Sequence, residues 1–234
     1  MKYAIIAAGE GSRLAGEGVS VPKPLVPICG EPMIERLLRI FRQNGAEETV
    51  VIVNTLAPQT EQYVRELIAN GQAPEVRLVV KTTPSSMHSF AALAPYLDGG
   101  PFCLTTVDTI FREEEFSEYI KTFKNTTADG LMAVTDYIDD EKPLYVATDE
   151  ALRITGFLDS YERDVRYISG GIYALKPVAL NTLRRCLDEG QSRMRNFQRG
   201  MIADGLHLSA LPFTKILDVD HAADIAKAEA FLRQ

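Results

Sequence analysis

The sequence has few cysteines, no excess of basic residues and no long hydrophobic run. Its three cysteines are odd in number and lack metal-ligand spacing, which argues against a disulfide framework and a zinc site. The formal net charge of −7, without any lysine or arginine cluster, excludes a general role in nucleic-acid binding. No apolar stretch approaches the ~20 residues of a membrane-spanning helix, and no signal peptide precedes the first apolar run. We therefore expect a cytoplasmic protein without a membrane partner.

Linker-like and low-complexity segments are also missing from the sequence. A chain of 234 residues with 46% hydrophobic content can bury one sizeable core. We therefore expect a single domain over residues 1–234.

Strand and helix patterns alternate along the first half, which is typical of a parallel sheet covered on both faces. Apolar runs predict strands at 3–7, 50–54, 76–80 and 102–107, and periodic apolar residues predict helices at about 32–44, 59–69 and 87–96. The second half predicts a helix at 116–123, strands at 131–135, 144–148, 153–158 and 168–175, a helix from Pro177 and a closing helix at 222–232. The predicted fold is α/β: a three-layer, mostly parallel, Rossmann-like sheet with a mixed β extension.

A glycine-containing loop follows the first strand, where the sequence reads Ala7-Ala8-Gly9-Glu10-Gly11-Ser12-Arg13-Leu14. The loop opens at the carboxyl end of a buried strand, where open α/β sheets bind ligands. Gly9 and Gly11 carry no Cβ, so their backbone amides can approach a phosphate closely. Arg13 adds a guanidinium group and Lys23, between two prolines, adds an ammonium group. Together these residues predict a binding loop for a polyphosphate.

Two familiar phosphate-binding motifs do not match this loop. A P-loop requires Gly-x-x-x-x-Gly-Lys-Ser/Thr running into a helix, and no such string occurs. The dinucleotide fingerprint requires a third glycine where Leu14 stands, and an acidic residue where the second strand ends at Asn54 and Thr55. We also expect no helix before about Pro32, so the loop belongs to another class.

The segment from Ala7 to Arg36 resembles the signature of the nucleotidyltransferase family that includes the sugar-1-phosphate nucleotidyltransferases, or NDP-sugar pyrophosphorylases, and the phosphocholine cytidylyltransferases. The likeness continues in patches along most of the chain. The resemblance implies the nucleotide-diphospho-sugar transferase fold and a single catalytic domain over residues 1–234, with a nucleotide-binding half at about 1–110 and an acceptor-binding half at about 111–234.

The resemblance also implies roles for residues of the loop. Arg13 is expected to neutralise the phosphates that leave as pyrophosphate, and Lys23 to bridge toward the α-phosphate. The residues expected to bind the nucleotide here are Ala7, Ala8, Gly9, Gly11 and Ser12.

Acidic residues follow two short apolar runs far apart in the sequence. Asp108 ends the strand at 102–107, and Asp218 and Asp220 follow a short apolar strand that Ile216-Leu217 predicts. Taken alone, Asp108 is more typical of a turn or a helix cap than of a metal site. The resemblance implies that it binds Mg²⁺ together with Asp218, because one carboxylate holds this cation poorly. Asp218 fits the family position better than Asp220, which is either the second ligand or the cap of the closing helix.

Two further segments are similar to substrate-binding segments of the family. Ser85 and Ser86 lie where relatives contact the base and ribose, and they either bind the nucleotide or cap a helix. Gly171 lies in a Gly-Ile-Tyr strand where the glycine lets the acceptor pack closely, unless it marks a β-bulge.

The chain departs from the family at the Glu-Lys step whose lysine reaches the acceptor phosphate. No lysine occurs between Lys142 and Lys176. Either Arg163 or Arg166 substitutes for it, or the acceptor is not an ordinary hexose 1-phosphate. The sequence leaves both alternatives open.

These features together predict a Mg²⁺-dependent nucleotidyltransferase that transfers NMP from an NTP to a sugar 1-phosphate or similar small phosphorylated acceptor, releasing pyrophosphate. A phosphate monoester is already anionic at neutral pH, so no general base is required, and no Ser/His/Asp or Cys/His set is evident. The alternatives are a cytidylyltransferase for an alcohol phosphate such as phosphocholine, an inactive subunit that senses nucleotide sugars, and a glycosyltransferase using Asp218-Val219-Asp220. The oligomeric state, including a homo-oligomer, stays open.

Overall fold

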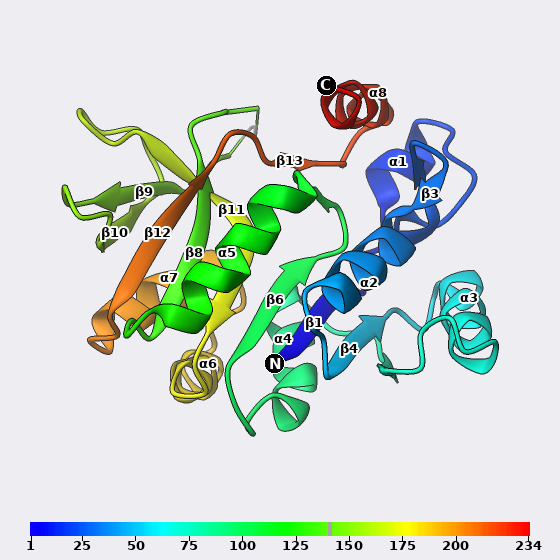
Figure 1. Cartoon of the computed structure of the whole chain (residues 1–234), viewed down its shortest axis with the longest axis horizontal. Coiled ribbons are helices and arrows are strands. Elements are labelled where there is room, and N and C mark those ends of the chain that lie inside the picture. The colour runs from blue at the N-terminus through cyan, green and yellow to red at the C-terminus, as the bar shows by residue number, and fades with distance from the viewer. Residues whose placement is uncertain (140–141) are drawn as a thin grey trace.

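The computed structural model describes residues 1–139 and 142–234, and one mixed sheet forms its centre (Figure 1). In these residues the sheet contains nine strands: β1 (Lys2–Ala7), β4 (Glu48–Val53), β5 (Val76–Val80), β6 (Phe102–Thr106), β8 (Gly130–Thr135), β9 (Tyr145–Thr148), β10 (Ile154–Leu158), β11 (Tyr167–Leu175) and β12 (Leu208–Phe213). Their order is β10-β9-β11-β6-β1-β4-β5, with β8 paired to β11 and β12.

The parallel part of the sheet consists of the strands from the first half of the chain. β1 lies between β4 and β6 and is parallel to both, and β5 is parallel to β4. From β1 the chain thus moves outward to β4 and β5 on one side and returns to β6 on the other. This change of direction opens a crevice at the carboxyl ends of β1 and β6, where α/β sheets place ligands.

The second half extends the sheet with mostly antiparallel strands. β11 is antiparallel to β6, β8 and β9, β10 is antiparallel to β9, and β12 alone is parallel to its partner β8. The predicted mixed extension of a mostly parallel sheet is therefore confirmed.

Helices cover both faces of the sheet and make three layers (Figure 1). They are α1 (Ser12–Gly16), α2 (Met33–Gln43), α3 (Pro58–Ala69), α4 (Ser86–Leu93), α5 (Glu113–Asn125), α6 (Ala179–Asp188), α7 (Met194–Ala203) and α8 (Ala222–Leu232). In β1, Tyr3 and Ile5 face a core that includes residues of α2, α3, α5 and α8, whereas Ala4 and Ile6 face a core with α4, α6 and α7. Because successive side chains of a strand point to opposite sides, β1 contributes to the core on both faces of the sheet.

Several element boundaries differ from prediction. The strand at Val76–Val80 and the closing helix at Ala222–Leu232 have the predicted bounds. The prediction of no helix before Pro32 is wrong, because α1 begins directly after Gly11. The helices and strands that were not predicted are α7, β12, and the short strands β2 (Pro27–Ile28), β3 (Glu31–Pro32) and β7 (Thr109–Ile110). The short strand expected before the carboxyl-terminal acids is present as β13 (Leu217–Asp218), with Asp218 as its last residue.

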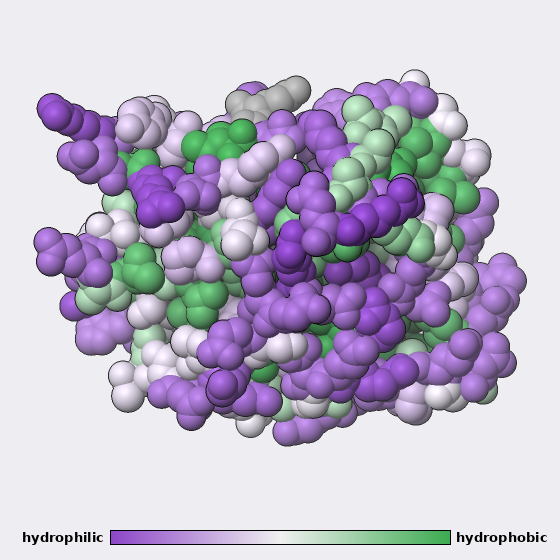
Figure 2. Space-filling view, turned by 45° about the horizontal axis from the view of Figure 1, so that its top comes forward, coloured by the Kyte–Doolittle hydropathy of each residue, from purple (hydrophilic) through white to green (hydrophobic). Residues whose placement is uncertain are grey.

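The surface is mainly hydrophilic on the face shown in Figure 2, where hydrophobic side chains form small, scattered groups. The large hydrophobic side chains that are exposed are Val21, Leu56, Ile138, Tyr161 and Val178. No helix in the described part of the chain has the length and apolar character needed to cross a lipid bilayer.

Candidate active site

A pocket of about 330 Å³ lies at the carboxyl ends of the parallel strands. Each of four strands contributes the residues that directly follow it or end it. The lining includes Ala7, Ala8, Gly9 and Glu10 after β1, Asn54 after β4, Thr82 to Ser86 after β5, and Thr106 to Asp108 at the end of β6, together with Lys23 and Pro24. The glycine loop and Asp108, a hundred residues apart in the sequence, thus share one cavity.

Gly11 lets the glycine loop and Lys23 pack against each other. Its φ is +62°, in the left-handed region that favours glycine. A Cβ at this position would lie 2.9 Å from the Cβ of Lys23, closer than side-chain carbons approach. At Gly9, by contrast, a Cβ would meet no described atom within 4 Å, so its backbone borders open space. The two glycines therefore differ: Gly11 permits internal packing, and Gly9 leaves room at the pocket.

The ammonium group of Lys23 lies between two carboxylates. It forms an ion pair with Asp108 and donates a hydrogen bond of 2.6 Å to Asp220. The Lys23 side chain is 11% exposed and that of Asp108 18%, so this contact is largely shielded from water. Burial lowers the pKa of Lys23, but Asp108 and Asp220 more than offset it, and the pKa lies above its usual value. Lys23 is therefore charged at neutral pH.

A short pairing of strands brings the two acidic segments together. β13 is antiparallel to β7, with Asp218 opposite Thr109, and the amide of Val219 donates a hydrogen bond of 3.1 Å to the carbonyl of Asp108. Burial raises the pKa of the Tyr173 phenol, and the charges of Asp218 and Asp108 contribute to the same shift. The predicted convergence of Asp108 with the carboxyl-terminal acids is thus present in the structure.

The structure separates Asp218 from Asp220. Asp220 contacts Lys23 and also accepts a hydrogen bond of 2.9 Å from Arg13. Asp218 is exposed and lines a neighbouring pocket together with Arg13, Asp220 and His221. The alternative that Asp220 caps the closing helix is wrong, because His221 is the N-cap of α8. Asp220 is the acid that joins both predicted cationic residues.

Arg13 lies on α1 and is 58% exposed, outside the pocket that Lys23 lines. Glu17, just after α1, fixes this helix to the start of α8: its carboxylate contacts the Nδ1 atom of His221 at 2.6 Å and accepts from the amide of Ala222 at 2.6 Å. Ser12 is exposed on α1 and does not line the pocket. Arg13 can thus reach a phosphate only at the mouth of the cavity.

The serines after β5 both line the pocket, and one of them has a structural role as well. Ser85 is the N-cap of α4: its hydroxyl accepts a hydrogen bond of 3.4 Å from the amide of His88 and lies 2.8 Å from the Nδ1 atom of the same residue. Ser86 is the first residue of α4. Capping and pocket lining therefore occur together in this segment.

Gly171 lies in β11 beside the end of β6. Its φ is +72°, and a Cβ would lie 3.4 Å from the Oγ1 atom of Thr109. The pairing of β11 with β8 shifts register between Ser169 and Tyr173, so the β-bulge weighed from the sequence is present. Gly171 does not line the nucleotide-side pocket.

Asn54 was missed as a candidate site residue. It is buried, its Nδ2 atom donates to the carbonyl of Ala8 at 3.0 Å, and its Oδ1 atom accepts from Thr82 at 2.7 Å. These bonds connect the loops after β1, β4 and β5. The sequence signal for Asn54 was a polar residue directly after an apolar parallel strand. The dinucleotide fingerprint predicts an acidic residue at this place, so an asparagine did not stand out.

The arginines expected to replace the acceptor lysine lie elsewhere. Arg166 forms an ion pair with Asp136 at 2.7 Å, and neither Arg163 nor Arg166 lines the pockets that contain Lys23 or Asp218.

Comparison with known proteins agrees with this geometry. The family model described as nucleotidyl transferase matches residues 2–234, so the chain belongs to that family. Mannose-1-phosphate guanylyltransferase 1 of Arabidopsis thaliana is 27% identical over 224 residues, which cover 91% of this chain and 59% of that protein. The UTP–glucose-1-phosphate uridylyltransferase of Synechocystis sp. is 41% identical over 66 residues, covering 28% of this chain and 17% of that protein.

Among solved structures, the inositol-1-phosphate CTP transferase from T. maritima matches with a TM-score of 0.78 and 18% identity, covering 99% of this chain and 97% of that one. The likeness shows the same fold. The chain spans about half the length of several curated relatives it matches, such as 52% and 59% of two mannose-1-phosphate guanylyltransferases.

Proposed function

We propose that this protein transfers a nucleoside monophosphate from an NTP to a sugar 1-phosphate or similar small phosphorylated acceptor and releases pyrophosphate. The observation that carries the proposal is the charged Lys23 at the pocket formed by the glycine loop, paired with Asp108 and Asp220. Relatives named for guanylyl, thymidylyl and uridylyl transfer share sugar 1-phosphates as acceptors, which supports the acceptor class more than any one base.

The chemistry requires positive charge more than a base. A phosphate monoester has a second pKa of ~6, so its oxygen is already a nucleophile at neutral pH. Its approach to a triphosphate is opposed by repulsion between anions, which fixed cations and backbone amides reduce. In this account Lys23 stabilises the charge at the attacked α-phosphorus, and Arg13 at the pocket mouth stabilises the departing pyrophosphate.

Mg²⁺ is part of the proposal, and the residues present suit it. Asp108 and Asp220 offer hard carboxylate oxygens, and the Oδ1 atom of Asp108 is buried without a hydrogen-bond partner among the described residues. No three His, Cys, Asp or Glu side chains in the described ranges converge on one point, so phosphate and water would complete the coordination. When bound, Mg²⁺ would neutralise phosphate charge. Asp218 is the third acid that we propose to test as a ligand.

The experiment is pyrophosphate release from CTP, UTP, GTP and dTTP, each with and without glucose 1-phosphate, mannose 1-phosphate or phosphocholine. Release that requires both an NTP and a sugar 1-phosphate supports the proposal. Release only with phosphocholine favours the alcohol-phosphate alternative. Nucleotide binding without release for any pair favours a sensing subunit, and consumption of a nucleotide sugar without pyrophosphate favours glycosyl transfer.

A substitution at Lys23 tests the residue that carries the proposal. Lys23→Ala should reduce turnover by at least ~100-fold, the usual scale for losing a transition-state electrostatic contact. Lys121→Ala is the matched control, because Lys121 is an exposed lysine on α5 and its ion pair among the described residues is with nearby Glu118. Near-normal turnover in Lys23→Ala would refute the role given to Lys23.

A further inference from the structure

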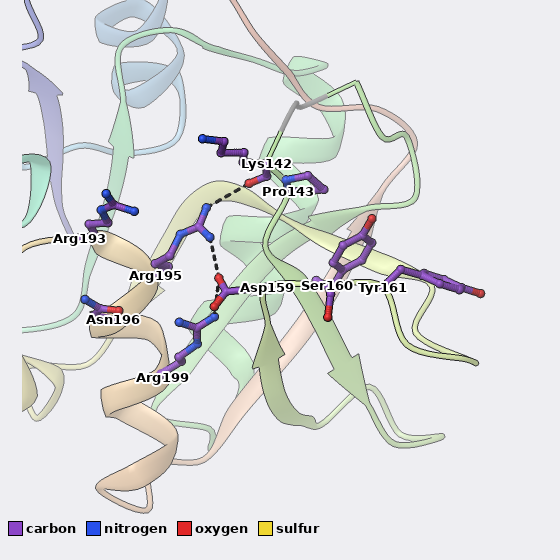
Figure 3. Close-up of a pocket in the computed structure, with 10 residues that line it drawn as sticks. Lys142, Pro143, Asp159, Ser160, Tyr161, Arg193, Arg195, Asn196 and Arg199 are labelled. Carbon is purple, nitrogen blue, oxygen red and sulfur yellow. Dashed lines mark hydrogen bonds and ion pairs between the residues drawn. The ribbon is translucent and has the colours of Figure 1, made fainter.

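A second pocket concentrates positive charge in an otherwise acidic chain. It is lined by four cationic side chains and one acidic one, namely Lys142, Arg193, Arg195, Arg199 and Asp159. The whole chain carries a formal charge of −7, so this local excess is not a property of the surface in general. Figure 3 shows the arginines reaching the pocket from α7 and its N-terminal end, opposite Asp159. Such a pocket favours an anionic ligand.

Two of the arginines are held in place by the fold. Arg195 and Arg199 lie four residues apart, on one face of α7. Arg195 donates to the carbonyl of Lys142 at 3.0 Å, and Arg199 donates to the carbonyl of Phe157 at 3.1 Å. Their side chains are only 27% and 34% exposed. The guanidinium groups are therefore positioned before any ligand arrives, which lowers the entropic cost of binding.

Asp159 occupies part of this arrangement. One of its oxygens lies 2.6 Å from Arg195 and 2.8 Å from Arg199 (Figure 3). Hydrogen bonds from Arg199 and Arg195 hold the pKa of Asp159 below its usual value, so the carboxylate stays ionised. Arg193, in contrast, is exposed and has no ion pair with a described residue. One internal carboxylate thus contacts two of the three guanidinium groups, and the lining side chains keep a net positive charge.

The arginine pocket and the nucleotide-side pocket share the packing of α4 against α7. Ser89 lines the nucleotide-side pocket, and its neighbour Phe90 contacts the ring of Phe197 with centroids 5.3 Å apart. Phe197 directly follows Asn196, which lines the arginine pocket. The helices that border the two pockets thus pack against each other.

A hydrogen-bonded link also connects α7 to β11, the strand beside β6. Gln198 accepts from the hydroxyl of Ser169 at 2.9 Å and donates to that of Tyr173 at 3.4 Å. Asp108, which follows β6, lies at the same end of the sheet. Helix α7, which carries Arg195 and Arg199, is thus bonded to the end of β11 that lies nearest Asp108.

We propose that the arginine pocket binds the phosphate of the acceptor substrate, with Arg193 and Arg195 as direct partners and Asp159 as an internal competitor that the phosphate displaces. The proposal rests on the proposed function for the identity of the ligand. Guanidinium groups bind phosphate oxygens in pairs, and a dianion competes well with a single carboxylate. Asp159 would thereby weaken binding of acceptors with less negative charge and set specificity for phosphate monoesters.

Substitutions at opposite charges give opposite predictions. Arg195→Gln should raise the KM for the acceptor about tenfold, and Arg193→Gln by several-fold, since each substitution removes a charge-assisted hydrogen bond to the phosphate. Asp159→Asn should lower the same KM, because it frees Arg195 and Arg199. The KM for the NTP should stay unchanged in all three. Arg65→Gln, an exposed arginine on α3 paired with Glu61, is the control and should change neither KM.

The experiment uses the full chain and two readouts. Acceptor KM is measured with whichever sugar phosphate supports pyrophosphate release, and the dissociation constant of inorganic phosphate is measured by calorimetry without nucleotide. Weaker phosphate binding in Arg193→Gln and Arg195→Gln, tighter binding in Asp159→Asn and parallel changes in acceptor KM support the proposal. Arg193→Gln keeps the test valid if Arg195→Gln does not fold, because Arg193 is exposed and has no ion pair with a described residue.

The contrary outcomes are distinct. Phosphate binding that is equal in all variants overturns the arginine pocket as an anion site. Altered phosphate binding with unaltered acceptor KM overturns its assignment to the acceptor. If no pair of substrates releases pyrophosphate but phosphate binding responds as predicted, the anion site stands and the proposed function fails.

Discussion

Replacing Lys23 with methionine removes the ammonium group that Asp108 and Asp220 share while keeping a side chain of similar length. Two carboxylates that contact the same ammonium group lie close together, and at a separation of ~5 Å two unit charges repel by roughly 3 kcal/mol with an effective dielectric constant of about 20. Asp220 is 43% exposed, so water screens part of this repulsion. We therefore expect the free energy of unfolding to fall by about 2 kcal/mol in the absence of divalent cations, equivalent to a Tm lower by about 4–8 °C.

Mg²⁺ should reverse this loss. With Lys23 gone, the two carboxylates attract a divalent cation more strongly, so added Mg²⁺ should stabilise Lys23→Met more than the natural protein. The assay is thermal unfolding with EDTA and with a series of Mg²⁺ concentrations, and Lys121→Met serves as control. A Lys23→Met variant with the natural Tm in EDTA and the natural response to Mg²⁺ would refute the electrostatic reasoning at this site.

Two further predictions concern the loop beside this site. Gly11→Ala should lower the free energy of unfolding by about 1–2 kcal/mol, because an alanine in the left-handed region is strained and its Cβ would press on Lys23. The Tm and the turnover should both fall, and a variant with normal values of both would contradict the packing described. The second concerns pH: the hydrogen bond between Glu17 and His221 raises the pKa of His221 and lowers that of Glu17. The stabilisation by this pair is fully present between about pH 4.5 and 6.5. It is lost as the pH rises through the raised pKa of His221, and as the pH falls through the lowered pKa of Glu17. Urea unfolding should therefore show Glu17→Gln to be most destabilised in that window, and a difference that does not change with pH would contradict this assignment.

The parallel half of the fold could be predicted because its strands are mainly apolar, and most positions of β1, β4 and β6 are buried. Runs such as Val76–Val80 are apolar at nearly every position, and α8 is rich in alanine, which favours helix. β12 was missed because it contains Pro212, which removes a backbone donor. The ladder with β8 runs along the whole strand, whereas the described contact on the other side is an isolated bridge at Ser209, away from Pro212. α1 was missed because five residues are too few to show a period.

The site could be predicted in its components but not in their pairing. The residues that end strands, Asp108 among them, project into one crevice as the fold requires. The choice between Asp218 and Asp220 depended on the register of β13, a strand of only two residues, which no local pattern determines. The arginine pocket depended on α7 packing against β10 and β11, a contact between segments far apart in the sequence.

The most direct test of the central claim is a crystal structure with a non-hydrolysable NTP and Mn²⁺, in which anomalous scattering locates the metal. The account predicts Mn²⁺ on Asp108 together with Asp220 or Asp218, the triphosphate on the backbone of residues 8–11, and Lys23 turned from the carboxylates to a phosphate oxygen. A metal away from Asp108, or a triphosphate outside the glycine loop, would contradict it.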